Sequence, residues 1–344
     1  GATLARRGPL LLLLDNVDPV VDHAHLISRW LHDAPETRII ATSRERLRVE
    51  GEVVVPVGPM ATADAAALFA ARARLAAAPW DVDHWAGAID RLVHQLDRMP
   101  LAIELAAARS TTLDPSVLAD QLAHHLDVLD AGRRDAPPRH RTLRSTLAWS
   151  VEHLSPRARD ALAAMAVFHG GFILDAARQV AGPYGLEGAL HELVEKSLVQ
   201  QSRGQQARYT MYRTVQTYAR TTWPAPDAAR RHAEHFGALG SSEAMASLRA
   251  PGGLARAERL RNDRGNLRAA MTWGLEHGHP DLAARACIAL CSVLRETGPA
   301  QDAVDACSRV LDAKNLDPSL ALRVELYAAD AYFQVGRAAD ALAV

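Results

Sequence analysis

Five consecutive leucines followed by an acid, Leu10 to Asp15, constrain the fold of this chain more than any other stretch. An apolar run of this length without polar alternation is typical of a strand buried on both faces of a parallel sheet. A helical stretch follows, and a second apolar run, Arg38 to Ala41, then leads into Thr42, Ser43 and Arg44. The order strand, helix, strand predicts two parallel strands whose carboxyl ends meet at one edge of a sheet.

That edge is the expected place for a ligand, because open α/β sheets bind ligands beyond the carboxyl ends of their strands. We therefore expect Asp15 and Arg44 to face one crevice. Asp15 then resembles a Walker B acid that holds Mg²⁺ through water, and Arg44 is placed to meet a terminal phosphate. The alternatives are an ordinary acid at a strand end and a surface salt bridge of Arg44. The valine-rich run Val53 to Val57 predicts a third strand.

From residue 61 the apolar spacing becomes helical, so the predicted fold class is mainly α with a partial α/β sheet of the P-loop NTPase type. Pro100 suits the first turn of a helix that follows a break at Met99. The stretch around residue 135 is rich in Gly, Pro and Arg, which predicts a linker. The predicted domains are a partial NTPase core (1–60), a helical lid (61–131), a linker (132–141), a winged helix (142–223) and a helical-repeat tail (228–344).

The winged helix is predicted from the order of its elements. A cap at Ser155 opens one helix, Gly182 ends a second, and a third precedes two short strands around Gly204; a final helix spans about Arg213 to Thr222.

The tail is predicted from a repeated spacing. Gly298 and Gly336 each stand five residues before an alanine in an otherwise helical region, and their separation is close to the repeat length of tetratricopeptide helix pairs.

Composition excludes several classes of protein. The 344 residues are 49% hydrophobic and carry a formal charge of −1, so the chain is globular and has no overall field for nucleic acid or anionic membrane. The apolar run at the start is too short to cross a bilayer, and we expect a cytoplasmic protein. The three cysteines, Cys287, Cys291 and Cys307, fit reduced thiols in helices, and core packing is favoured over redox chemistry for the first two. His23 and His25 lack the partners of a zinc site.

Five segments, taken in order, resemble a known family. They are LLLLDN, RIIATSRERL, MPLAIELAAAR, the run from RHRTLRSTLAWSVEHLSP to AVFHGGF, and the helical tail. Together they resemble the NB-ARC-type signal-transduction ATPases of the STAND class. Within that class the chain is most similar to bacterial regulators that join such an ATPase to a SARP-type or LuxR-type DNA-binding domain and a tetratricopeptide tail.

The resemblance implies an ATP/ADP site with Mg²⁺. It assigns Mg²⁺ to Asp15 through water and the reading of the γ-phosphate to Arg44. It adds Asn16, Thr42 and Ser43 to the nucleotide site, and the amide at Asn16, where more active relatives have a second acid, implies slow hydrolysis suited to a switch.

Two further motifs of the family lie later in the chain. Pro100 and Leu101 correspond to a motif that packs against adenine, although Arg98 and Met99 depart from its usual residues. Tyr212 stands at the position of a histidine that touches the ADP β-phosphate, and Arg213 reverses the charge of the usual acid beside it.

No G-x-x-x-x-G-K-[ST] loop occurs in these 344 residues. Because that loop cradles the phosphates, we expect this chain alone to bind nucleotide weakly and to be inactive, with the loop upstream of Gly1 in a longer polypeptide. The leading hypothesis is the regulatory core of an ADP/ATP switch in transcriptional regulation. Its tail would bind protein partners, ATP would promote self-assembly, and DNA would be bound outside this chain. The alternatives are a scaffold with a decayed nucleotide site and a direct winged-helix DNA binder.

Overall fold

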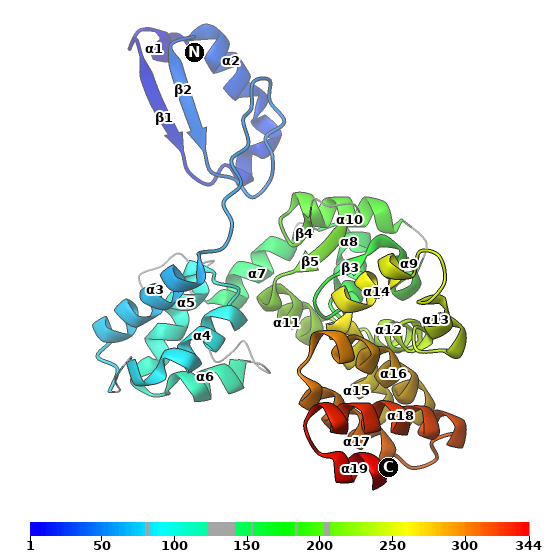
Figure 1. The fold of residues 1–344 in the computed structure, drawn as a ribbon. Coiled ribbons are helices and arrows are strands. Elements are labelled where there is room, and N and C mark those ends of the chain that lie inside the picture. Colours follow the sequence, from blue (N-terminus) through cyan, green and yellow to red (C-terminus); the bar gives the residue numbers. More distant parts are fainter. Residues whose placement is uncertain are drawn as a thin grey trace. The chain divides into compact units, whose positions relative to one another are not determined.

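The computed structural model describes residues 1–79, 81, 83–122, 129, 142–152, 154–182, 185–202 and 207–343. The chain divides into two compact units (Figure 1). The first contains Gly1–Leu154 and Leu190–Val199, and the second contains Ser155–Ala189 and Gln200–Val344. The predicted linker, 132–141, and the predicted turn at Gly204 lie outside the described residues.

The first unit begins with the predicted strand–helix–strand order. Strand β1 (Leu10–Leu14) and strand β2 (Thr37–Ala41) pair in parallel, with Leu10 opposite Thr37 and Leu14 opposite Ala41. Between them lie the 3₁₀ helix η1 (Asp18–His23) and helix α2 (His25–Asp33), and the short helix α1 (Ala2–Ala5) precedes β1. The parallel pair is thus confirmed, and it places the residues that follow β1 and β2 at one edge.

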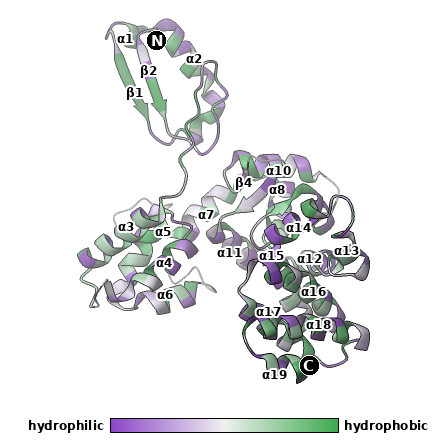
Figure 2. Cartoon of the chain, viewed as in Figure 1, coloured by the Kyte–Doolittle hydropathy of each residue, from purple (hydrophilic) through white to green (hydrophobic). Residues whose placement is uncertain are grey.

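The prediction that the first strand is buried on both faces is wrong for these residues. β1 is hydrophobic along its whole length (Figure 2), yet its exposure alternates, with Leu11 55% and Leu13 67% exposed. Ile40 of β2 is also 55% exposed. The alternating exposure along both strands shows that one face of this two-stranded sheet is open to solvent.

The predicted third strand, Val53 to Val57, is also wrong. These residues have no regular secondary structure, and Val53, Val55 and Val57 are 85%, 77% and 94% exposed. A valine-rich run has high strand propensity, but a strand also needs a hydrogen-bonded neighbour, and the sheet here consists of β1 and β2.

A helical subdomain follows in the first unit, and it includes residues 143–152, which the predicted bounds assign to the winged helix. Its helices are α3 (Thr62–Leu75), α4 (Ala86–Gln95), α5 (Pro100–Ala108), α6 (Pro115–Leu122) and α7 (Leu143–Glu152), with η2 (Asp83–Trp85) and η3 (Arg109–Thr111) between them. α3 packs against α5, and α4 packs against α6. The core is made of fully buried large side chains, among them Phe69, Leu92, Leu96, Ile103 and Leu105.

The second unit opens with α8 (Pro156–Met165), β3 (Phe172–Ile173) and α9 (Leu174–Ala181). As predicted, the Ser155 hydroxyl caps α8 by accepting from the Ala158 amide, and α9 ends at Gly182, whose φ is +97°. α10 (Leu186–Glu195) begins in this unit and ends in the first. β4 (Val199–Ser202) and β5 (Arg208–Met211) follow, and the sheet order is β3-β5-β4. α11 then spans Arg213–Thr222, the predicted bounds.

The rest of the second unit is helical, as the tail prediction requires. It contains α12 (Pro226–Ala238), α13 (Ser242–Ser247), α14 (Gly253–Asn262), α15 (Arg264–Glu276), α16 (Pro280–Thr297), α17 (Ala300–Leu311), α18 (Pro318–Gln334) and α19 (Ala338–Ala343). Each helix from α15 to α19 packs against the next along the chain. Gly298 and Gly336 lie in turns between helices with φ of +62° and +78°, a backbone region that favours glycine.

A buried polar cluster joins the start of this tail to the sheet of the second unit. Asn266 of α15 is fully buried, and its amide donates to the Gly171 carbonyl at 2.9 Å while its carbonyl accepts from the His169 amide at 2.6 Å. His232 of α12 donates to the same Asn266 oxygen at 3.2 Å. Arg208 of β5 forms an ion pair with Asp263 at 2.7 Å. These bonds satisfy the buried groups, so the cluster orders the elements it joins.

Candidate functional site

The carboxyl edge of the β1–β2 sheet brings together the residues predicted for a phosphate and magnesium site. The exposed Asp15 carboxylate accepts from the Thr42 hydroxyl at 2.6 Å, and that hydroxyl in turn accepts from the Asn16 amide at 2.8 Å. The backbone continues the ladder, because Thr42 donates to the Leu14 carbonyl and Val17 donates to the Thr42 carbonyl. The two strand ends are thereby fixed side by side.

Asn16 has a positive φ of 56°, which turns the chain away from the strand directly after Asp15. Asparagine tolerates this left-handed conformation better than most residues. The turn leaves the Asp15 carboxylate at the strand end and carries the chain into η1.

Arg44 is placed at the same edge, but its ionic partner is Asp18 and not the predicted phosphate position. Asp18 accepts from the Arg44 backbone amide at 2.9 Å and from the Arg44 Nε at 3.2 Å. It also accepts from the Ser43 hydroxyl at 3.0 Å. The Asp18 side chain is only 8% exposed, whereas that of Arg44 is 39% exposed. Asp18 therefore holds the segment after β2 against the start of η1.

The pKa of Asp18 is lowered by these bonds. Burial by itself would raise the pKa of a carboxyl group, but the Arg44 amide, the Ser43 hydroxyl and the Arg44 charge together outweigh that effect. Asp18 is thus an anion at neutral pH and a strong acceptor for the Arg44 guanidinium.

The Arg44 guanidinium also contacts helix α7. Its Nη1 donates to the Ser150 hydroxyl at 2.6 Å, and its carbon lies 3.8 Å from the centre of the Trp149 ring. A cation over an indole face at this distance is stabilised by about 0.5 to 2 kcal/mol. One side chain therefore connects the strand edge to a helix more than a hundred residues later.

The residues after Arg44 extend this contact. Glu45 pairs with Lys196 at 2.9 Å, Arg48 pairs with Glu195, and the Ser197 hydroxyl donates to the Arg44 carbonyl at 2.8 Å. Lys196 and Glu45 are both mostly buried as side chains. We call residues 44–48 the sensor segment, because they follow the predicted sensor strand and contact both α7 and the residues at the end of α10.

The remaining predicted site residues lie elsewhere. Pro100 is exposed and is the first residue of α5, and Leu101 follows it half-buried in the helical subdomain. Tyr212 precedes α11 in the second unit, and its hydroxyl accepts from the Gln200 side chain within that unit. No measurement joins these residues to Asp15, so their roles at a nucleotide remain predictions.

Sequence reasoning missed Asp18, Trp149 and Ser150. Asp18 lies three residues after the predicted acid, Asp15, in a stretch predicted to be helical. No sequence motif marks it as a partner of Arg44. Trp149 and Ser150 belong to a segment quoted for the family resemblance, but nothing local in that segment indicates a partner 106 residues away. A tryptophan beside a serine is a weak signal without the fold.

Comparisons with known proteins identify relatives of this chain. It is 36% identical over 288 residues to a protein of Mycobacterium tuberculosis strain H37Rv named "Putative HTH-type transcriptional regulator", and equally to one of Mycobacterium bovis. That alignment covers 78% of this chain and 32% of each relative. An uncharacterised protein of Mycobacterium tuberculosis is 34% identical over 221 residues, 61% of this chain and 56% of that protein. The chain is therefore a homologue of these transcriptional regulators, and it spans about a third of the length of the first of them.

The structural comparison matched a STAND protein with a tetratricopeptide repeat sensor from Pyrococcus horikoshii. The match has 13% identity and a TM-score of 0.23, and it covers 97% of this chain and 61% of that one. No family model matches the chain. Among the described residues, no helix combines the length and hydropathy needed to cross a bilayer.

Proposed function

We propose that residues 1–344 are the regulatory core of a transcriptional regulator that switches between an ADP-bound and an ATP-bound state. The observation that carries the proposal is the edge of the β1–β2 sheet, where Asp15 follows one strand and Arg44 follows its parallel neighbour. An acid and an arginine at adjacent strand ends are the groups that a magnesium nucleotide needs at such an edge.

The residues at this edge fit magnesium. Asp15 is an exposed carboxylate bonded to the Thr42 hydroxyl, and hard cations such as Mg²⁺ prefer oxygen ligands. When bound, Mg²⁺ would supply charge neutralisation for the nucleotide phosphates. Asp15 would hold it through water, and Asn16 and Thr42 would line the same edge.

Arg44 supplies the switching element. In this structure its guanidinium is shared between Asp18, Ser150 and the Trp149 ring. A terminal phosphate carries more charge than one carboxylate and would compete with Asp18 for the guanidinium. Movement of Arg44 toward a phosphate would break its bonds to α7, and the rest of the sensor segment would transmit the change to the Lys196 and Glu195 contacts. We propose that the bonds described here belong to the state without a γ-phosphate.

The other parts of the chain have supporting roles in this proposal. Pro100 and Leu101 would meet the adenine, and Tyr212, at the junction of β5 and α11, would meet the ADP phosphates. The helical tail would bind protein partners. The net charge of −1 supports a DNA-binding region outside residues 1–344, and the words "HTH-type" in the relatives' names are consistent with one.

The proposal is tested with the longest natural polypeptide that includes residues 1–344. Its mass in solution is measured with MgADP and with a non-hydrolysable MgATP analogue. The switch predicts a change in assembly or hydrodynamic radius between the two, and it predicts that Asp15→Ala abolishes the change. An unchanged mass and radius with both nucleotides would overturn the proposal in favour of a nucleotide-independent scaffold.

A further inference from the structure

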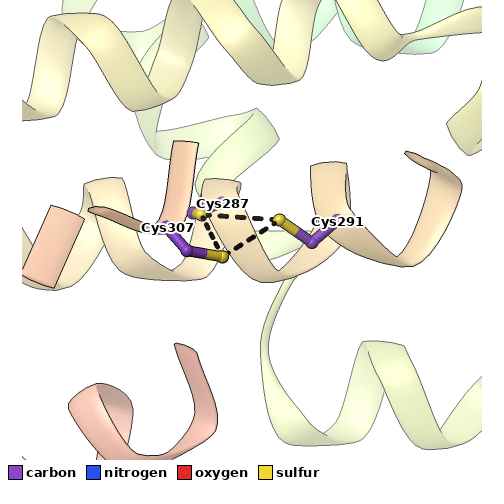
Figure 3. A group of neighbouring side chains, drawn as sticks. All are labelled: Cys287, Cys291 and Cys307. Atoms are coloured by element: carbon purple, nitrogen blue, oxygen red, sulfur yellow. Dashed lines mark hydrogen bonds between the residues drawn. The ribbon is translucent and has the colours of Figure 1, made fainter. Parts of the chain in front are cut away.

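Three cysteine side chains meet in the core of the helical tail (Figure 3). Cys287 and Cys291 lie one turn apart on α16, and Cys307 lies on α17, which packs against it. The sulfur atoms point toward one another, with separations of 3.5 Å between Cys291 and Cys307, 3.8 Å between Cys287 and Cys291, and 4.0 Å between Cys287 and Cys307. All three are free thiols and at most 1% exposed.

These separations match the spacing of thiolates around a single ion. With ion–sulfur bonds of about 2.3 Å, sulfur atoms lie about 3.4 Å apart at the pyramidal angles of a trivalent ion and about 4.0 Å apart at trigonal angles. The three measured separations lie within that range, so an ion could be bound with small side-chain movements. We propose that Cys287, Cys291 and Cys307 form a three-thiolate site for a thiophilic metal or metalloid ion.

The surroundings of the sulfurs limit which ion fits. Within the described part of the chain, no histidine, aspartate or glutamate ligand atom joins this cluster. The nearest further oxygen recorded for it is the Ala303 carbonyl, 4.0 Å from Cys291 Sγ. Structural zinc takes four protein ligands, so a cluster of three soft donors favours ions that are stable with three, such as Cu(I) and As(III).

Charge favours the trivalent ion. Three thiolates around Cu(I) leave two negative charges in a fully buried site, which is costly in a medium of low dielectric constant. Arsenite leaves none, because As(OH)₃ and three thiols give the tris-thiolate and three waters. We therefore expect arsenite to bind more tightly than Cu(I), and both to bind more tightly than Zn²⁺.

The three thiols are enclosed between α16 and α17. Because the site is buried, entry requires local opening of α16 from α17.

The test uses the intact chain, reduced with a phosphine so that no added thiol competes. Arsenite, Cu(I) and Zn²⁺ are titrated separately, and the bound ion is counted by native mass spectrometry. We expect one arsenite per chain, a thermal unfolding midpoint raised by at least about 3 °C, and loss of both effects in Cys287→Ala, Cys291→Ala and Cys307→Ala.

Val304→Ala is the matched control, because Val304 is a buried neighbour on α17 that carries no ligand. It should lower stability and keep one bound arsenite. Circular dichroism reports whether each variant folds. If a cysteine variant does not fold, the wild-type chain is alkylated with and without arsenite instead. Bound arsenite should protect all three cysteines from alkylation.

Protection of no thiols, or one arsenite retained by every cysteine variant, would overturn the site and leave the cysteines as core side chains. Tighter binding of Zn²⁺ than of arsenite and Cu(I) would overturn the three-coordinate assignment. None of these readouts involves nucleotide, so the outcome is independent of the proposed switch.

Discussion

At the scale of single residues, Asp18 orders the edge of the β1–β2 sheet. Its carboxylate accepts from the Arg44 amide, the Arg44 guanidinium and the Ser43 hydroxyl, so it fixes both the backbone and the side chain of the sensor segment. Asp15 lies three residues earlier and bonds only Thr42 among the hydrogen bonds recorded for it. Asp18 thus orders the sensor segment, whereas the Asp15 carboxylate lies exposed at the edge of the sheet.

Replacement of Asp18 tests this difference. Asp18→Ala removes three hydrogen bonds, two of them to one arginine, and we expect the free energy of unfolding of the first unit to fall by about 1 to 3 kcal/mol. Chemical denaturation followed by circular dichroism measures it. The matched control is Asp22→Ala, an exposed acid in the same 3₁₀ helix, which should change stability by no more than about 0.5 kcal/mol. Equal effects of the two substitutions would contradict the role of Asp18.

The buried histidine in the second unit gives a prediction for pH. Burial lowers the pKa of His232 from 6.5 to about 3. On acidification His232 therefore takes up a proton in the unfolded chain before it does so in the folded chain. The contribution of neutral, buried His232 to the free energy of unfolding is complete above pH 6.5 and falls as the pH drops toward 3. Between pH 7 and 5 this one group should cost about 2 kcal/mol of stability.

His232→Gln keeps a donor for Asn266 and removes the titration. Its loss of stability between pH 7 and 5 should be about 2 kcal/mol smaller than that of the wild type, as measured by urea unfolding at each pH. His191→Gln serves as control, since its side chain is 72% exposed and is solvated before and after unfolding. Parallel pH curves for the wild type and His232→Gln would show that His232 is not the responsible group.

At the scale of elements, close approach between helices shapes the tail. Gly240 follows α12, and a Cβ placed on it would lie 1.7 Å from the Arg285 carbonyl of α16. A Cβ placed on Gly274 of α15 would lie 2.9 Å from the backbone nitrogen of Ala283 of α16, a looser but still close approach. Side chains larger than hydrogen cannot fit at these points without moving the backbone, so glycine sets the spacing of the first tail helices.

Gly240→Ala should therefore destabilise the second unit by about 3 kcal/mol. Gly188→Ala is the matched substitution, because a Cβ at Gly188 of α10 meets nothing within 4 Å and alanine is the better helix former there by about 1 kcal/mol. Thermal unfolding of both variants checks this pair. A Gly240→Ala variant as stable as Gly188→Ala would show that α12 and α16 do not approach so closely.

Local signals account for the elements that the sequence predicted well. Ser155, Gly182 and Pro100 act on their own helix ends, so their effect can be read without the fold. The prediction of a strand at Val53 to Val57 was wrong because a strand forms only beside a hydrogen-bonded neighbour. The prediction that Leu11 and Leu13 are buried was wrong because burial depends on which elements cover a face of the sheet.

The same distinction applies to the sites. The position of Asp15 and Arg44 at one edge follows from strand order alone, whereas the Asp18 and Trp149 contacts of Arg44 depend on how segments pack. The proximity of Cys287 and Cys291 could be predicted, because they are four residues apart in a helical stretch. Cys307 joins them only because α17 packs on α16.

At the scale of the whole molecule, the chain combines an α/β edge suited to nucleotide with a helical tail that carries its own buried cysteine cluster. The first lies in the first unit and the second lies in the second unit. The relatives named as transcriptional regulators are about three times as long as the region that aligns with this chain. The proposed switch and the proposed ion site lie in different units, so each proposal can be tested without the other.

The central claim, that Arg44 distinguishes ATP from ADP, is tested most directly by the two affinities of the longest natural polypeptide that includes residues 1–344. Isothermal titration with MgATP and MgADP is compared between wild type and Arg44→Ala. Loss of charge-assisted bonds to a γ-phosphate should weaken ATP binding about 10- to 100-fold and leave ADP binding within about twofold. If Arg44→Ala weakens both nucleotides equally, or neither, Arg44 does not read the γ-phosphate and the account is contradicted.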